Sequence, residues 1–221
     1  MKLTSQQLNK ELSKKSYRRF LLNDKLTDLF KDFQVTKVVD LGGSNVEGEK
    51  YFKYPKYKAK EWIIINISEE ALPDVIGSIY ETGLENASVD AVVCTEVFEH
   101  LADPFAAIAE IKRILKPGGI FIGSTPFLFK VHGDPDDYFR YTESALRNVI
   151  LKDFSKVELF SMGGGLGTVG MLITQVTNDM KYRLVRYAFI LLSRIMILVD
   201  YKMGHERKAD LTTGYIWRCE L

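Results

Sequence analysis

Two carboxylates and an imidazole lie close together in the sequence, at Glu96, Glu99 and His100. An imidazole titrates near neutral pH, so His100 is a candidate general base toward a hydroxyl group, and His132 is a second candidate. Carboxylates and an imidazole can also bind a divalent cation such as Mg²⁺ or Mn²⁺, with Asp137 or His132 completing the shell. A polar cap on the following helix explains Glu99 and His100 without chemistry, and we favour no metal here.

A second candidate site is a glycine turn in the segment Lys37–Asn45. The β-branched and apolar residues before the turn predict a buried strand. Gly42 and Gly43 let the backbone turn sharply and approach a ligand without a Cβ in the way. Asp40 stands at the start of the turn, where its carboxylate can orient loop amides or receive the charged end of a ligand. A strand that leads into a glycine turn is how an open α/β sheet forms a cofactor crevice.

The same segment excludes two sharper nucleotide-binding motifs. Ser44 stands where the dinucleotide fingerprint Gly-x-Gly-x-x-Gly requires its second glycine. Gly43 and Gly48 have the spacing of a P-loop, but Glu49 stands where that motif requires its lysine. A nicotinamide-dependent oxidoreductase is therefore only a minor alternative, and a phosphate cradle is not expected.

The elements that would position these residues alternate between strands and helices. Continuous apolar runs such as Trp62–Ile65 are typical of parallel strands that are buried on both faces. The alternation implies right-handed crossovers and a parallel sheet. Residues 127–142 are expected to form a long loop, and loops of that length tend to be functional. Strands are expected over 38–41, 61–67, 74–79, 90–95, 120–122, 156–161 and 214–220, and helices over 104–115 and 144–151.

Residues 1–34 are expected to form an N-terminal helical lid, and residues 35–221 the main domain. The spacing of leucines predicts a helix over Thr4–Phe33, which Asn23–Asp24 divides in two. Four basic residues of this segment are expected on a solvated face, namely Lys14, Lys15, Arg18 and Arg19.

An apolar and basic helix is expected over residues 181–203, before the last strand. Its core, Leu184–Val199, is interrupted by Arg186 and Arg194 and is too short and too charged to span a membrane. A cationic stripe beside a wide apolar face suits a helix that lies on a membrane. Packing on its own domain or on a second subunit is the favoured interpretation.

The composition is that of a globular protein of 221 residues, 46% apolar and 27% charged. A net charge of +1 requires no nucleic acid partner. Cys94 and Cys219 lie in apolar runs and do not indicate a disulfide framework, which fits a reduced cytoplasmic setting. The segment Met1–Lys15 has no apolar signal-peptide core.

Four motifs, in this order, resemble those of the class I S-adenosylmethionine-dependent methyltransferases. They are Val-Val-Asp-Leu-Gly-Gly, Asp-Ala-Val-Val-Cys-Thr-Glu-Val-Phe-Glu-His-Leu-Ala-Asp-Pro, Glu-Ile-Lys-Arg-Ile-Leu-Lys-Pro-Gly-Gly and Ser-Thr-Pro-Phe. The loop His-Gly-Asp-Pro-Asp-Asp-Tyr-Phe-Arg-Tyr-Thr resembles the branch found among cell-surface polysaccharide biosynthesis proteins. The resemblance covers residues 35–161 and the last strand. It implies an α/β, three-layer, Rossmann-like sheet of seven strands, mostly parallel with an antiparallel last strand.

The resemblance also implies S-adenosylmethionine as the cofactor, bound across the carboxyl ends of the first, second and fourth strands. Asn66 and Ser78 depart from the family, which prefers an acid at the first position and often has one at the second. Each lost charge-assisted hydrogen bond costs on the order of 1.5–3 kcal/mol, so a degenerate binding module without catalysis is an alternative. The implied cofactor contacts are Asp40, Gly42 and Gly43 at the methionine end, Asn66, Ile67, Ser78 and Ile79 at the ribose and adenine, and Thr95 and Glu96 near the sulfonium.

The branch implies O-methylation of a sugar or of a glycan or lipid-linked precursor. Tyr138, Arg140 and Tyr141 in the long loop would stack on a sugar or hold an anionic group, or else form the hydrophobic base of the next helix. The spacing Glu96-x-x-Glu99-His100 also resembles the divalent-metal motif of certain class I methyltransferases that act on small-RNA ends and quinone precursors. The expected location is the cytoplasm, with peripheral contact at the inner membrane surface as the alternative. The oligomeric state is not predicted.

Overall fold

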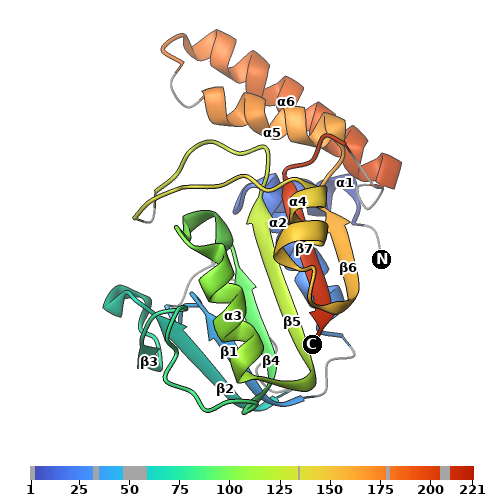
Figure 1. Ribbon diagram of the computed structural model, residues 1–221. Coiled ribbons are helices and arrows are strands. Elements are labelled where there is room, and N and C mark those ends of the chain that lie inside the picture. The colour runs from blue at the N-terminus through green and yellow to red at the C-terminus, as the bar shows by residue number, and fades with distance from the viewer. Residues whose placement is uncertain (1–2, 32–34, 47–58, 134, 178–179, 205–209) are drawn as a thin grey trace.

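The computed structural model describes residues 3–31, 35–46, 59–133, 135–177, 180–204 and 210–221. Its strands are β1 (Val35–Leu41), β2 (Ala59–Asn66), β3 (Val75–Ile76), β4 (Val89–Thr95), β5 (Leu115–Pro126), β6 (Ser155–Ser161) and β7 (Gly214–Glu220). They form one seven-stranded sheet in the order β3-β2-β1-β4-β5-β7-β6 (Figure 1). The pairs from β3 to β5 are parallel, whereas β7 is antiparallel to both β5 and β6. The predicted α/β sheet with an antiparallel last strand is confirmed.

The central strands are buried on both faces, which makes the fold three-layered. Successive strand residues point to opposite faces, so Val39 and Val92 pack in the core cluster that contains Ile111 of α3 (Pro104–Ile114). Val38 and Val93 pack on the other face, against the N-terminal helices. Continuous apolar strands are therefore required here, because neither face of the sheet is left to solvent.

The N-terminal segment forms two helices, α1 (Ser5–Leu12) and α2 (Tyr17–Leu29), which cover one face of the sheet. The Thr4 side chain caps α1 in a capping box. The helix breaks before Ser16, whose side chain accepts the Arg19 N–H and caps α2. The expected break at Asn23–Asp24 is wrong, because both residues lie inside α2. The two helices instead separate before Ser16, the N-cap of α2. Residues 32–34 of the expected lid lie outside the described residues.

Two further helices, α5 (Gly165–Thr177) and α6 (Arg183–Gly204), follow β6. They pack antiparallel, because the Gly164 N–H reaches Asp200 and the Ser193 hydroxyl reaches the carbonyl of Gly170. This α5–α6 hairpin lies beyond the carboxyl end of β5 (Figure 1). The helix expected over 181–203 is present. Among the described residues, no helix is both long enough and apolar enough to cross a membrane. The short helix α4 (Glu143–Ala145) and a π turn over Leu146–Ile150 follow the long loop.

A glycine in β5 makes a close contact that should be sensitive to one added methyl group. A Cβ at Gly123 would lie 2.2 Å from the ring of Trp217, which is fully buried. Gly123→Ala should lower the free energy of unfolding by about 1–3 kcal/mol, because the ring has no room to move. Urea denaturation measures this change. In the matched variant Gly165→Ala the new Cβ meets nothing closer than 3.7 Å, so an equal loss there would contradict the packing argument.

Candidate functional site

Parallel pairing brings the carboxyl ends of β1, β2, β3 and β4 to one edge of the sheet. Asp40 near the end of β1 is level with Ile64 of β2 and Val93 of β4, and Asn66 is level with Ile76 of β3. The residues expected to hold a cofactor are in the last positions of these strands or just after them, and therefore lie along the same edge. They are Asp40, Gly42, Gly43, Asn66, Ile67, Ser78, Ile79, Thr95 and Glu96.

The turn after β1 is one that only glycine can make. Gly42 has φ +81°, which is the left-handed region, and its N–H donates to the carbonyl of Ile65. A Cβ at Gly42 would lie 2.5 Å from Val97 Cγ2, and one at Gly43 would lie 2.2 Å from the Asp40 carboxylate. Asp40 is buried beneath the turn. The two glycines are therefore required for the turn to close over this carboxylate.

Asn66 at the end of β2 holds the glycine turn in place. Its side-chain amide donates to the carbonyl of Gly43 at 2.8 Å, and its side-chain oxygen accepts the N–H of Ser68 at 3.0 Å. An acid at this position would face the Gly43 carbonyl with no proton to donate. The departure of this chain from the acidic residue of the family therefore has a structural reason.

The next two loops supply an apolar surface beside the glycine turn. Ile67 is 64% exposed after β2, and Ile79 packs partly against the core after β3. The Ser78 hydroxyl accepts the N–H of Tyr80, so it holds its own turn. Exposed apolar side chains next to a bare backbone turn suit a flat ring such as a nucleobase.

A buried ion pair between Glu96 and Arg18 lies next to the end of β4. Arg18 comes from α2, and its guanidinium forms two contacts with the Glu96 carboxylate, one of them a hydrogen bond of 2.7 Å. Glu96 also accepts the Ser124 hydroxyl at 2.6 Å, and Arg18 donates to the carbonyl of Thr213. Burial lowers the pKa of Arg18, and the charge of Glu99 opposes that shift.

Arg18 is the functional residue that sequence reasoning missed, since it was expected on a solvated face. It is only 5% exposed. The signal was its spacing, because Arg18, Leu22 and Leu26 are four residues apart and lie on one face of α2.

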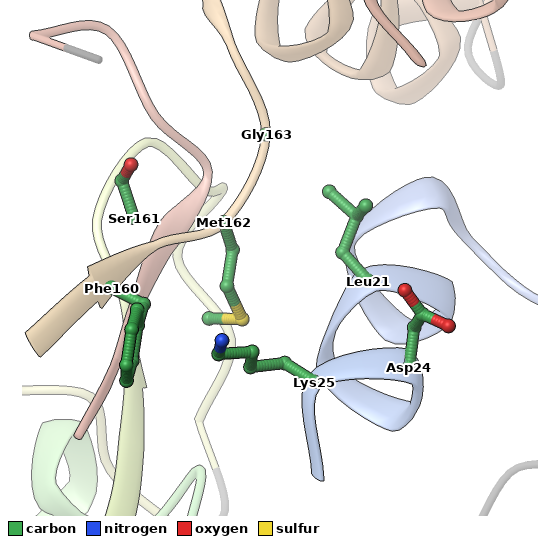
Figure 2. A pocket seen from close by; sticks show the side chains of 7 residues that line it. All are labelled: Leu21, Asp24, Lys25, Phe160, Ser161, Met162 and Gly163. Carbon is green, nitrogen blue, oxygen red and sulfur yellow. The ribbon is translucent and has the colours of Figure 1, made fainter. Parts of the chain in front are cut away.

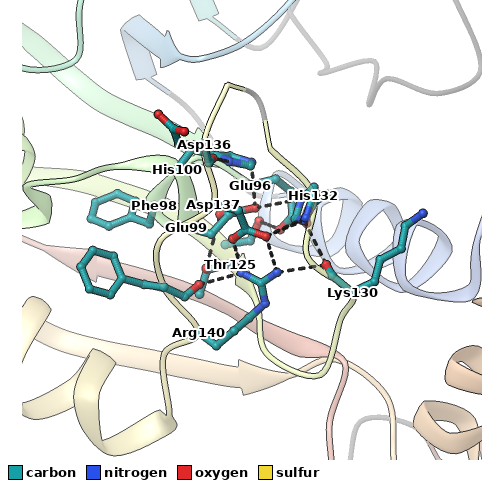
Figure 3. A network of polar contacts seen from close by, with 12 residues as sticks. Glu96, Phe98, Glu99, His100, Thr125, Lys130, His132, Asp136, Asp137 and Arg140 are labelled. Carbon is teal, nitrogen blue, oxygen red and sulfur yellow. Dashed lines mark hydrogen bonds and ion pairs between the residues drawn. The ribbon is translucent and has the colours of Figure 1, made fainter.

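Glu99, His100 and His132 form a cluster of titratable groups beside this ion pair (Figure 3). The Glu99 side chain is fully buried, and one of its oxygens accepts the Thr125 hydroxyl. The other oxygen lies 3.6 Å from His100 Nε2 and 3.8 Å from His132 Nε2. No donor in the described part of the chain is within hydrogen-bonding distance of that second oxygen. Burial raises the pKa of Glu99, and the charge of Arg18 opposes this effect.

His132 reaches this cluster because an ion pair fixes the long loop. Arg140 donates to both carboxylate oxygens of Asp137 and to the carbonyl of Lys130. Asp137 Oδ2 also accepts the backbone N–H of His132 at 2.8 Å (Figure 3). The hydrogen bonds from Arg140 lower the pKa of Asp137. Burial and the nearby His100 lower the pKa of His132 below 6.5.

These contacts bear on the possible metal ligands, which the sequence did not favour. Glu96 and Asp137 are held by arginines, whereas Glu99, His100 and His132 each offer a ligand atom, and these atoms lie within 4.8 Å of one another.

The aromatic residues of the long loop divide into an exposed and a buried group. The Tyr138 ring is 50% exposed, and its hydroxyl donates to Asp136. Tyr141 is 7% exposed and donates to the carbonyl of Phe98 within the core. Tyr138 is therefore accessible to a methyl-acceptor substrate. Tyr141 forms the hydrophobic base of the loop, and Arg140 fixes the shape of the loop.

A separate hollow of about 360 Å³ lies between α2 and β6 (Figure 2). Leu21, Lys25, Phe160 and Met162 line it, and Lys25 Nζ stands 3.7 Å above the Phe160 ring. None of the residues expected to bind a cofactor or an acceptor lines this hollow.

Asn66 offers a direct test of how the glycine turn is held. Asn66→Asp should lower the free energy of unfolding by about 1–3 kcal/mol, because a carboxylate oxygen replaces the amide that donates to Gly43. Asn45→Asp removes a similar amide donor to the carbonyl of Leu72 at an exposed position and should cost less. Urea denaturation of both variants measures the difference. An unchanged stability of Asn66→Asp would refute the bracing role.

Known proteins match this chain in sequence over part of its length and in fold over most of it. A family model described as a methyltransferase domain matches residues 40–123. A probable S-adenosylmethionine-dependent methyltransferase of Mycolicibacterium smegmatis is 48% identical over 50 residues, which is 23% of this chain and 20% of the relative. The matched segments span a fifth or less of the curated relatives.

Solved structures extend the likeness in fold. A methyltransferase from Archaeoglobus fulgidus has a TM-score of 0.58 at 17% identity, over 92% of this chain and 94% of that one. Phosphoethanolamine N-methyltransferase 2 of Haemonchus contortus, in complex with S-adenosyl-L-methionine, has a TM-score of 0.56 at 14% identity, over 90% of this chain and 52% of that one. The sheet therefore has the fold of known S-adenosylmethionine-dependent methyltransferases, and within it residues 40–123 match a methyltransferase domain.

Proposed function

We propose that this chain transfers a methyl group from S-adenosylmethionine to a hydroxyl group of a sugar or of a glycan or lipid-linked precursor. The observation that carries the methyl transfer is the methyltransferase-domain match over residues 40–123, which begins at the glycine turn and includes the ends of β1 to β4. The Mycolicibacterium relative is named for the same donor, and the Haemonchus structure contains it.

The residues at the sheet edge fit this donor. The backbone at Gly42 and Gly43 has no side chains that would block a close approach, and Asp40 lies beneath it. Ile67 and Ile79 offer apolar surface for an adenine ring. The Asn66 amide group already donates to the glycine turn, and its side-chain oxygen accepts the N–H of Ser68. Asn66 would therefore contact a ribose hydroxyl only by accepting a second hydrogen bond at that oxygen.

The Glu96 carboxylate is neutralised by Arg18 and is hydrogen-bonded to Ser124, so it is held away from a direct role. Contact near the sulfonium would come from the backbone around Thr95 and Glu96. When bound, the donor supplies an electrophilic methyl group. The chain must hold the acceptor in line with it and take up the proton of the hydroxyl group.

His132 and His100 are placed to accept that proton. Because its pKa is lowered, His132 is largely neutral at pH 7 and can accept a proton at Nε2. The second oxygen of Glu99 lies near Nε2 of both histidines, so the ionised form of this carboxyl group would stabilise the imidazolium that forms. Buried charges interact more strongly than charges in water, which makes this neighbour effective. These histidines are the feature that favours a hydroxyl acceptor.

The acceptor class rests on the long loop. Tyr138 and Phe139 are exposed aromatic rings in contact with each other on the loop that carries His132, and such rings stack on the apolar faces of sugars. Arg140 is already paired with Asp137, so it acts by positioning the loop. The resemblance of this loop to the polysaccharide branch supports the same class.

Two alternatives follow from particular residues. A binding module that retains the fold without catalysis is favoured if the use of the Asn66 amide by the turn weakens donor binding. A nicotinamide-dependent oxidoreductase lacks support because Ser44 interrupts the dinucleotide fingerprint.

Calorimetry with S-adenosylhomocysteine and with NAD separates these functions. We expect heat with the first ligand only, and binding weakened at least about tenfold, or 1.4 kcal/mol, in Gly43→Ala, because the new Cβ would displace Asp40. Gly165→Ala should bind as the unchanged protein does. Heat with NAD would favour the oxidoreductase. No heat with either ligand would contradict the methyltransferase proposal, and donor binding without labelled product from any hydroxyl acceptor would favour the binding module.

The pH dependence of kcat/KM tests the histidine base. A base must be unprotonated, so activity should rise with pH through an apparent pKa below 6.5 and then level off. His132→Gln should remove that acidic limb and lower activity by about 10²–10⁴-fold, the usual contribution of a general base. Activity that is lost in EDTA and restored by Mn²⁺ would show that Glu99, His100 and His132 hold a cation instead, and so would contradict the base role.

A further inference from the structure

The outward face of α6 is apolar and has no partner among the described residues. Leu184, Leu191, Ile195 and Val199 are spaced by seven, four and four residues, so they share one face of the helix, and they are 85%, 61%, 50% and 40% exposed. A single exposed apolar residue is ordinary, but a continuous stripe of this length indicates an interaction surface. We propose that α6 is a docking surface for anionic membranes and lies flat on them.

The opposite face of α6 holds the helix on the protein. Ser193 bonds to α5 through the Gly170 carbonyl, and Asp200 accepts the hydroxyl of Tyr17 at 2.9 Å. Tyr201 accepts the N–H of Leu3. These contacts lie in the carboxyl-terminal half of the helix and fix which face points outward.

The amino-terminal part of α6 extends beyond these supports. Residues 181–189 are all exposed, on every side of the helix. Leu184 precedes Asp200 by 16 residues, which at 1.5 Å per residue places it about 24 Å from that anchor. An apolar helix end without packing of its own is costly in water, because burial of apolar surface is what stabilises helices in proteins.

The charges around the stripe match an anionic partner. All the exposed charged side chains described between residues 180 and 204 are basic, namely Lys181, Arg183, Arg186, Arg194 and Lys202. The one acid in this range, Asp200, is buried and hydrogen-bonded to Tyr17. The whole chain carries only +1, so the excess is local to the hairpin. An apolar face bordered by lysine and arginine is the pattern of a helix that lies in a lipid–water interface.

A second copy of α6 would suit this face less well. A copy packed on the stripe would bring the two sets of arginines together without any exposed acid of α6 to pair with them. Anionic headgroups would pair with the exposed arginines beside the stripe, Arg183 and Arg194, which lie on one side of it.

The placement of the hairpin would orient the whole molecule. It lies beyond the carboxyl end of β5, at the same end of the sheet as the long loop that carries His132 and Tyr138 (Figure 1). A membrane under α6 would therefore face the acceptor side of the candidate site.

Vesicle flotation of the full chain tests the proposal without an activity assay. Vesicles of phosphatidylcholine mixed with phosphatidylglycerol should bind at least about tenfold more protein than phosphatidylcholine alone, and added salt should reduce the difference. The double variant Leu191→Glu with Ile195→Glu should lose binding, as should Arg183→Glu with Arg194→Glu. Matched controls are Val149→Glu, which charges an exposed apolar residue elsewhere, and Lys152→Glu, which reverses an exposed lysine. Both controls should bind normally.

Three results would overturn the proposal: no binding to either vesicle, equal binding to both, or binding that survives the α6 substitutions. Analytical ultracentrifugation of the same proteins tests the alternative that a second copy of the chain packs on the stripe. If the unchanged protein binds no vesicles and forms a dimer, and the double variant Leu191→Glu with Ile195→Glu is a monomer, then a second copy covers the stripe. Circular dichroism confirms that each variant is folded, which is expected because both substituted leucine and isoleucine side chains point to solvent.

Discussion

Parallel pairing of β1 with β2 on one side and β4 on the other is the constraint on which the rest depends. Because the carboxyl ends of parallel strands meet at one edge, the loops that follow them have to meet there too. The glycine turn, Asn66 and the segment from Glu96 to His100 are brought together in this way, although 60 residues separate Asp40 from His100. Helices cover both faces of the sheet, so this edge is where chemistry can be exposed.

The buried pair of Arg18 and Glu96 connects that edge to the N-terminal helices. Glu96 has φ +59°, an unusual backbone conformation for a residue with a side chain. Both terminal guanidinium nitrogens of Arg18 and the hydroxyl of Ser124 hold its carboxylate in place. Removing one partner of a buried pair typically costs about 3–5 kcal/mol, because the other charge is left uncompensated. The helices α1 and α2 are thus part of the site rather than a detachable cover. The long loop repeats this principle, since Arg140 and Asp137 hold His132 next to Glu99.

Local patterns in the sequence were enough to predict the sheet. The apolar runs around Val38 and Val92 predicted strands, and these are confirmed. The resemblance to the methyltransferase family implied the antiparallel last strand, which is also confirmed. What could not be predicted depends on contacts between distant segments. Arg18 pairs with a residue 78 positions away, and a solvated face was the simpler explanation for a lysine- and arginine-rich stretch. Likewise, Asp137 was a possible member of a metal set that was not favoured, and its spacing did not show that Arg140 would pair with it. The helix break was expected at Asn23–Asp24, whereas α2 begins after its N-cap Ser16.

We propose that the bare backbone at Gly42 and Gly43 holds the methionine end of the donor. A crystal structure of the protein soaked with S-adenosylhomocysteine tests this most directly. The methionine end of the ligand should lie at the glycine turn above Asp40, with the adenine against Ile67 and Ile79. Electron density for the ligand in the hollow between α2 and β6, beside Lys25 and Phe160, would contradict the claim.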